Sequence, residues 1–571
     1  MFSPSHLARA FTLIAALTIA PPAALQAQTA EQALPSGLAG AFLTGRVAVA
    51  SDDVTRMALS YSQALQADPE NEGFRELAMQ GSLLIGDLEA AARFAAQAAA
   101  RDQVTQAAAL ILQADAFKRG EYALVIDMLD QGNLTGPLTD AMGRAWAKLG
   151  AGSMSEALDA FDAAIAERAE IAPFARYHKA LALALVGDME RAANILSGDA
   201  EGRVSMSRRG ILAHMTILSQ IGRFDEALQL AESVFGGAPD DDVAEIVASL
   251  QAEQPVPFTT VASAIDGMAE VYFTLSGALI GEQGDWLPII YGQLALSLRA
   301  DHGDAILLTG QLLERLSQYD LADQTYRRMP EGHAQYLGAA LGRTNALYQA
   351  GQADEAIAAL IALSETRPDS ALVFSSLGDL LRREERFAEA AEAYTRAIDL
   401  IDEIEERHWV LLYTRAIALE RIGDWEAAEP EFRRVLEFVP NEPQVLNYLG
   451  YSLLEQRRNL DEALDMIERA VAGDPESGYI TDSLGWAYYR LGRYDEAVPV
   501  MERAVELLPR DPILNDHLGD VYYAVGRTRE ARFQWRRALS FAPHPDLDVD
   551  LVRRKLEIGK DAALEEFESA Q

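Results

Sequence analysis

Residues 482–509 of the chain read DSLGWAYYRLGRYDEAVPVMERAVELLP, and residues 516–543 read DHLGDVYYAVGRTREARFQWRRALSFAP. The two stretches align without a gap at an offset of 34 residues. The alignment superposes identical residues, among them Gly485 and Gly519, Tyr488 and Tyr522, Ala497 and Ala531, Ala504 and Ala538, and Pro509 and Pro543. Self-similarity at a fixed period of this length indicates a repeat protein.

The small residue at Ala497 recurs along most of the chain. Upstream, mostly at steps of 34 or 35 residues, the matching positions are Met57, Ala91, Val125, Ala157, Ala192, Ala227, Pro288, Ala322, Ala356, Ala390, Ala428 and Ala463. Together with Ala497 and Ala531, these positions predict about fourteen repeats.

Each repeat has the pattern of two amphipathic helices joined by a short turn such as residues 491–494, because apolar residues recur at helical spacing. Glycine and alanine at fixed positions let two helix backbones approach closely. A proline such as Pro509 stops the second helix, because it lacks an N–H donor and clashes with the preceding turn. One helix pair cannot bury its own apolar faces, so repeats stack on one another. We therefore predict an all-α superhelical solenoid.

The pattern resembles the tetratricopeptide repeat, in which a Leu-Gly pair, a tyrosine, two alanines and a proline stand at these spacings. Residues 447–470 and 482–497 are also similar to exported tetratricopeptide repeat adaptor proteins of proteobacterial envelopes. Some of those relatives are lipoproteins that present substrates to a periplasmic protease, but this chain has no cysteine to carry a lipid anchor. The resemblance implies that the first helix of each repeat lines a concave groove.

The resemblance also implies where a ligand would bind, since the family places its contacts at five positions of that first helix. On this chain, those positions predict a protein-binding groove formed by Asn345, Tyr348, Gln349, Asp379, Arg382, Arg383, Tyr413, Arg421, Asn447, Tyr451, Asp482, Trp486, Tyr489, Arg490, Asp516, Asp520 and Tyr523. Tyrosine, tryptophan and arginine are enriched at recognition surfaces. Each residue could instead pack against a neighbouring helix, and that alternative stays open. Clamping of a C-terminal carboxylate is not expected, because aspartates stand where such a clamp needs a cation.

The first 27 residues predict a secretory signal peptide. Met1–Arg9 contains one arginine and no acidic residue, Ala10–Ala20 is an uninterrupted apolar run, and Ala27 offers a cleavage point. Eleven apolar residues are too few for a transmembrane helix, which needs about 20, although an uncleaved anchor is the alternative. We expect an exported, periplasmic protein that is soluble or peripherally associated with the envelope.

The repeat rhythm breaks between Ala227 and Pro288, where the step is 61 residues. Residues 224–298 contain no lysine or arginine and include the proline-bounded stretch 254–257. The break is interpreted either as a joint between two arrays or as one repeat with a lengthened helix. The expected organisation is a signal peptide (1–27), an N-terminal degenerate array (28–255) and a C-terminal array (256–571).

Composition and motifs exclude several function classes. The chain has 571 residues, and its 87 acidic and 49 basic residues give a formal net charge of −38. Because phosphate contacts need clustered lysine and arginine, we expect no nucleic acid partner and instead a protein or peptide with basic segments. Phosphate-loop, nucleophile-elbow and His-Glu-x-x-His motifs are missing, and no two of the eight histidines have zinc-pair spacing. We expect no catalytic residue, cofactor or metal, and no membrane segment in the mature chain.

Two hypotheses for function follow. The first is a non-catalytic periplasmic adaptor that binds protein or peptide segments in the concave groove. The alternative is a structural scaffold for an envelope assembly, such as a pilus, polysaccharide export or division machinery, which would act through its outer face and ends.

Overall fold

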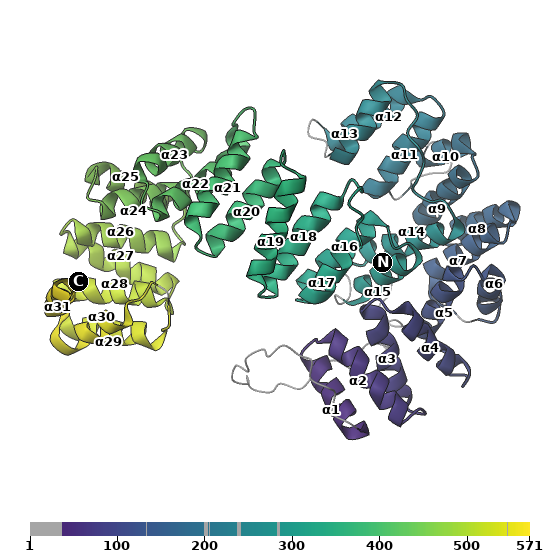
Figure 1. Ribbon diagram of the computed structural model, residues 1–571, viewed down its shortest axis with the longest axis horizontal. Helices are drawn as coiled ribbons and strands as arrows, with labels where there is room; N and C mark the ends of the chain where they lie inside the picture. The colour runs from purple at the N-terminus through teal and green to yellow at the C-terminus, as the bar shows by residue number, and fades with distance from the viewer. Residues whose placement is uncertain are drawn as a thin grey trace. The chain divides into compact units, whose positions relative to one another are not determined.

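The computed structural model describes residues 37–132, 134–198, 204, 206–236, 241–281, 286–544 and 546–570, and all regular structure in these ranges is helical (Figure 1). The predicted signal peptide lies outside the described residues. None of the described helices is both long and apolar enough to cross a bilayer. The chain divides into two compact units. Unit 1 is made of the described residues within Met1–Arg223 and Pro257–Arg299, and unit 2 of those within Phe224–Val256 and Ala300–Gln571.

The helices of unit 1 are α1 (Leu38–Ala50), α2 (Val54–Ala67), α3 (Glu72–Leu84), α4 (Leu88–Ala99), α5 (Gln106–Lys118), α6 (Tyr122–Asp130), α7 (Pro137–Gly150), α8 (Met154–Glu167), α9 (Ala172–Leu185), α10 (Met189–Leu196), α11 (Arg208–Gln220), α14 (Ala264–Ala278) and α15 (Trp286–Leu298).

The helices of unit 2 are α12 (Phe224–Phe235), α13 (Asp241–Gln251), α16 (Gly303–Arg315), α17 (Tyr319–Tyr326), α18 (Tyr336–Gln349), α19 (Ala353–Thr366), α20 (Ala371–Arg383), α21 (Phe387–Asp399), the 3-10 helix η1 (Glu406–His408), α22 (Trp409–Arg421), α23 (Trp425–Phe438), α24 (Pro443–Glu455), α25 (Leu460–Gly473), α26 (Gly478–Arg490), α27 (Tyr494–Leu507), α28 (Pro512–Ala524), α29 (Thr528–Ser540), α30 (Val549–Ile558) and α31 (Lys560–Ala570).

The repeat of α26 and α27 shows how the sequence sets its own boundaries. The Ser477 side chain accepts a hydrogen bond from the backbone N–H of Ile480 and so caps the start of α26. Gly492 ends the turn after α26 with a φ of 74°, a backbone conformation that glycine adopts without strain. The second helix ends at Leu507, two residues before Pro509.

Close approach of the two helices of a repeat confirms the predicted frame. The twelve alanines and valines predicted at the small position of the second helix are fully buried, at 0% exposure: Ala91, Val125, Ala157, Ala192, Ala227, Ala322, Ala356, Ala390, Ala428, Ala463, Ala497 and Ala531. A Cβ atom on Gly519 would lie only 2.5 Å from the Trp535 ring of the facing helix. The all-α solenoid is therefore confirmed.

Helices α14 and α15 are packed into unit 1 on the side of its first helices. Helix α14 contacts α5, α7 and α9, and α15 contacts α3 and α5. Gly267 of α14 lies against the fully buried ring of Trp146 on α7. At the α15 end, the side-chain amide of Gln293 donates a 3.2 Å hydrogen bond to the backbone oxygen of Leu84. Four first helices of unit 1, α3, α5, α7 and α9, are thus covered by a helix pair of the same chain.

A buried carboxylate ties α14 to the helices that it covers. Glu270 is 1% exposed and accepts hydrogen bonds from the Tyr177 hydroxyl at 3.0 Å and from Arg209 Nε at 2.8 Å. A buried carboxylate is tolerated only when donors of this kind satisfy it. The pairing therefore fixes the register of α14 against unit 1.

The predicted boundary between residues 255 and 256 stays a prediction, and the compact units are grouped around it as follows. Residues 257–299 belong to unit 1, and residues 224–256 are grouped with unit 2. The interrupted repeat does not contain one lengthened helix, since α12 and α13 are separate elements. Helix α15 packs into unit 1 because it carries no charged residue and is buried along most of its length. Such a helix needs an apolar surface on more than one side.

We expect Gly267→Ala to lower the free energy of unfolding by about 1–3 kcal/mol, because the added methyl group would lie 2.3 Å from the Trp146 ring and force α14 away from α7. Gly277→Ala is the matched control on the same helix. No atom lies within 4 Å of its added Cβ, so it should raise stability by about 0.5–1 kcal/mol. Urea unfolding of the two variants measures the difference, and equal stability would show that α14 does not pack as described.

Candidate protein-binding groove

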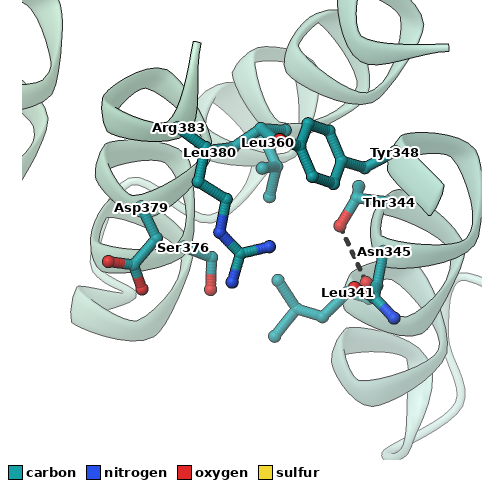
Figure 2. A pocket seen from close by; sticks show the side chains of 9 residues that line it. All are labelled: Leu341, Thr344, Asn345, Tyr348, Leu360, Ser376, Asp379, Leu380 and Arg383. Carbon is teal, nitrogen blue, oxygen red and sulfur yellow. Dashed lines mark hydrogen bonds between the residues drawn. The ribbon is translucent and has the colours of Figure 1, made fainter. Parts of the chain in front are cut away.

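A pocket of about 180 Å³ opens between the first helices α18 and α20 of unit 2. Figure 2 shows that the side chain of Arg383 points into it, toward Ser376 and Leu341, with Tyr348 on another wall. Its lining combines apolar and polar side chains: Leu341, Thr344, Asn345, Tyr348, Leu360, Ser376, Asp379, Leu380 and Arg383. Four residues of the predicted groove, Asn345, Tyr348, Asp379 and Arg383, are therefore brought together here.

Most polar groups around this pocket already have partners within the chain. The Thr344 hydroxyl donates to the backbone oxygen of Leu341 at 2.7 Å, and the Asn345 amide donates to Glu314. Asp379 accepts a 2.7 Å hydrogen bond from the Tyr394 hydroxyl, whose pKa is raised by burial and by that carboxylate. These internal bonds hold the pocket walls in place before any ligand arrives.

The middle of the predicted strip mixes packing residues with accessible ones. Tyr413 lies in an aromatic cluster, with its ring centroid 6.0 Å from that of Phe432, and burial raises its pKa to about 12. Burial also raises the pKa of Tyr451. Asn447 has a buried side-chain oxygen without a hydrogen-bond partner in the described residues. Gln349, by contrast, is exposed at the end of α18.

In the second-last repeat, the predicted residues are engaged with one another. Trp486 stacks on the His517 ring with centroids 4.1 Å apart, and on Tyr489 with centroids 4.8 Å apart. His517 Nδ1 lies 2.9 Å from an oxygen of the buried Asp482. Burial would lower the pKa of His517, but the carboxylates of Asp482, Asp516 and Asp520 hold it above its ordinary value.

Glu455 connects this cluster to the preceding repeat. It accepts a 3.1 Å hydrogen bond from the Trp486 indole and lies 3.4 Å from a guanidinium nitrogen of Arg490. Trp486 and Arg490 are therefore held by the same carboxylate, which fixes the orientation of both side chains along α26.

The chain's own C-terminal helices engage the last predicted residues. Lys555 of α30 is 3% exposed, and its ammonium group lies 2.8 Å from Asp516 and 2.9 Å from Asp520. Lys560, at the start of α31, lies 3.8 Å from Asp520 and donates to the hydroxyl of Tyr489. Helices α30 and α31 thus occupy the positions at which a ligand would meet these repeats.

Sequence reasoning missed Lys555, because it lies beyond the last aligned repeat (residues 516–543) and therefore at none of the family contact positions. No local pattern marks it, since its aspartate partners lie 39 and 35 residues upstream. Gly559 lies close to Tyr523, since a Cβ atom on Gly559 would be only 2.9 Å from the hydroxyl oxygen of Tyr523. The site residues Leu360 and Ser376 were missed as well, because neither stands at a family contact position.

Metal binding has no candidate in the part of the chain that the structure describes, where no three histidine, aspartate or glutamate side chains gather in a way that could hold an ion. The buried aspartates instead face lysine, histidine, tyrosine and tryptophan donors, for example the Trp535 indole, which donates to Asp520 at 3.0 Å.

Comparisons with known proteins agree with this architecture. A family model described as tetratricopeptide repeat matches residues 341–403, 413–478, 450–512 and 483–546. The TPR repeat-containing protein PA4667 of Pseudomonas aeruginosa is 29% identical over 185 residues, which is 32% of this chain and 30% of that protein. The match thus spans less than a third of that relative's length.

Three solved structures are similar to the chain. One chain of the APC/C hetero-tetramer Cut9–Hcn1 is 15% identical to this chain. The alignment covers 79% of this chain and 96% of that one, with a TM-score of 0.37. A tetratricopeptide repeat protein from Parabacteroides merdae is 14% identical, with 45% and 98% covered and a TM-score of 0.38. MamA from Desulfovibrio magneticus is 22% identical, with 31% and 97% covered and a TM-score of 0.27.

Residues 341–403 and 413–546, which the family model matches, are tetratricopeptide repeats. Tetratricopeptide repeats indicate an adaptor for protein–protein interaction, and proteins built from them are generally non-catalytic scaffolds.

His517→Gln should destabilise the protein by about 1.5–3 kcal/mol at pH 5.5, because the variant loses a charge-assisted bond to Asp482. Since the folded-state pKa of His517 is raised, its contribution is fully present below the ordinary value of 6.5 and is lost as the pH rises through the raised value. The deficit should therefore shrink at pH 8.5. Urea unfolding of both proteins at the two pH values tests this, and an unchanged deficit would contradict it.

Proposed function

We propose that the protein is exported to the periplasm by the leader at residues 1–27 and acts there as a non-catalytic adaptor. It binds extended or helical segments of other proteins along the first helices of unit 2. The pocket between α18 and α20 carries this proposal, because it has an apolar floor, fixed polar walls and four residues at family contact positions.

Other first helices of the chain are already occupied, which supports the first helices from α18 to α24 as the binding surface. Helices α14 and α15 cover the first helices of unit 1, and Lys555 and Lys560 occupy the last repeats of unit 2. The stretch from α18 to α24 retains exposed or half-exposed contact positions, among them Gln349, Arg383 and Arg421.

A scaffold role is the second candidate, and the first helix pair favours it. Helix α1 exposes Leu43 at 62% and Val47 at 64%, and α2 exposes Leu59 at 54%. Apolar residues that are exposed together mark interaction surfaces. With its first helices covered, unit 1 has its outer face and this end available for assembly contacts.

Photo-crosslinking in cells separates the two candidates. Benzoylphenylalanine in place of Gln349, the exposed residue that follows Tyr348 of the pocket wall, samples the surface beside the pocket. In place of Glu392 it samples the exposed side of α21, and in place of Leu43 it samples the end of unit 1. The adaptor proposal expects protein adducts at position 349 and few at 392. Adducts confined to positions 43 and 392 would favour the scaffold and contradict the adaptor.

Filling the pocket should block binding without unfolding the array. Ser376 lines the pocket, and its hydroxyl bonds only the backbone oxygen of Leu372 in its own helix. We expect Ser376→Phe to reduce adducts at position 349 by about tenfold or more, the loss associated with a binding hot spot. Ser364→Phe is the control, since Ser364 of α19 makes the same kind of bond to Ile361 away from the pocket. Equal adduct yields from both variants would sink the pocket as the site.

A further inference from the structure

Four arginines stand at the C-terminal ends of the first helices in the predicted groove, and they differ in their partners. Arg382 faces Asp379 at 3.9 Å and the Tyr394 hydroxyl at 3.2 Å, while Arg490 faces Glu455 at 3.4 Å. Arg383 and Arg421 form no ion pair or hydrogen bond with any residue that the structure describes. Two guanidinium groups on this surface are therefore free to bind an anion.

Aromatic rings hold both free guanidinium groups in place. The central carbon of the Arg383 guanidinium lies 5.6 Å from the centroid of Tyr348, and that of Arg421 lies 4.5 Å from the centroid of Phe387. A guanidinium stacked on a ring keeps its N–H donors available in the plane, where they can meet a carboxylate side by side. Both side chains are exposed, so a ligand can reach them.

The two arginines also occupy the same position in their helices. Arg383 is the last residue of α20 and Arg421 the last residue of α22, and these two helices contact each other. Packed helices lie about 8–10 Å apart. Side chains of an extended strand alternate between its two faces with a rise of about 3.3 Å per residue, so two side chains two residues apart face the groove together, about 6.6 Å from each other, and the flexible arginine side chains bridge the remaining distance.

The net charge of the whole chain does not describe the first helices position by position. The net charge of −38 led to the expectation of basic partners, which stays a prediction for the rest of the surface. On the contact positions of α26 and α28, however, Asp482, Asp516 and Asp520 are already neutralised by His517 and Lys555. Next to the pocket, Arg383 carries a positive charge without an ion pair, and beside it the exposed carboxylates of Glu384 and Glu385 also form no ion pair with any residue that the structure describes.

Resting on the adaptor function proposed above, we propose that Arg383, Arg421 and the pocket between α18 and α20 bind an acidic protein segment. Two aspartate or glutamate side chains, spaced two residues apart in an extended segment, pair with Arg383 and Arg421. A neighbouring apolar side chain enters the pocket, where Leu341, Leu360 and Leu380 line the wall around the Arg383 side chain (Figure 2).

Selection from a displayed library of random ten-residue peptides on the full-length protein tests the chemistry. The wild type should enrich peptides that carry two acidic residues and an apolar residue. The double variant Arg383→Glu/Arg421→Glu should lose this enrichment. Enrichment of basic or uncharged peptides on the wild type, identical enrichment on both proteins, or no enrichment at all would overturn the proposal.

Affinities of the most enriched acidic peptide give the contribution of each arginine. Arg383→Gln and Arg421→Gln should each weaken binding about two- to fivefold, as for exposed ion pairs, and binding of the wild type should weaken as salt is added. Arg396→Gln is the matched control: Arg396 also lies over a ring, that of Phe374 at 5.8 Å, but on the second helix α21. It should leave the affinity unchanged, and a loss equal to that of Arg383→Gln would overturn the assignment.

The Ser376→Phe variant distinguishes failure of this inference from failure of the adaptor proposal. Uncharged peptides that are enriched on the wild type and blocked by Ser376→Phe would keep the pocket as a binding site and refute only its preference for acidic segments. Peptides that bind the wild type and Ser376→Phe equally, together with missing adducts at position 349, would refute both. Melting temperatures of the arginine variants should equal that of the wild type, because none of the three arginines is buried.

Discussion

Close contact between the two helices of each repeat is the constraint on which the rest of the structure depends. The contact needs a residue without a bulky side chain, and the buried alanines at intervals of about 34 residues supply it. Once two helices meet there, each pair still exposes apolar surface that only the next pair can cover. The period, the stacking and the surface formed by the first helices all follow from this single contact.

The same constraint leaves the first helices of every repeat open, and the chain itself closes part of this surface. In unit 1, α14 and α15 cover α3, α5, α7 and α9, with Glu270 satisfied by Tyr177 and Arg209. In unit 2, Lys555 and Lys560 neutralise Asp516 and Asp520 at the last repeats. A buried charge must find its partner within the fold, so these contacts are structural rather than available for a ligand.

Electrostatics distinguishes the first helices from α18 to α24 from the first helices that other parts of the chain cover. Paired arginines such as Arg490 are anchored to carboxylates, whereas Arg383 and Arg421 rest on aromatic rings and keep their donors free. A net charge of −38 therefore describes the average surface, while specificity at one site depends on which few charges the fold has left without partners.

The sequence by itself determined the repeat, its boundaries and the positions along each first helix, because these depend on local spacing: Gly485, Ala497 and Pro509 act within one helix pair. It also placed Asn345, Tyr348, Asp379 and Arg383 at contact positions, and the fold brings these four together around one pocket. Only the tertiary structure decided which of the predicted positions are occupied. The partners of Asp516 and Asp520 lie 39 and 35 residues away, and α14 meets Tyr177 across 93 residues. Such pairings depend on how helices pack in space, and no periodicity in the sequence encodes them.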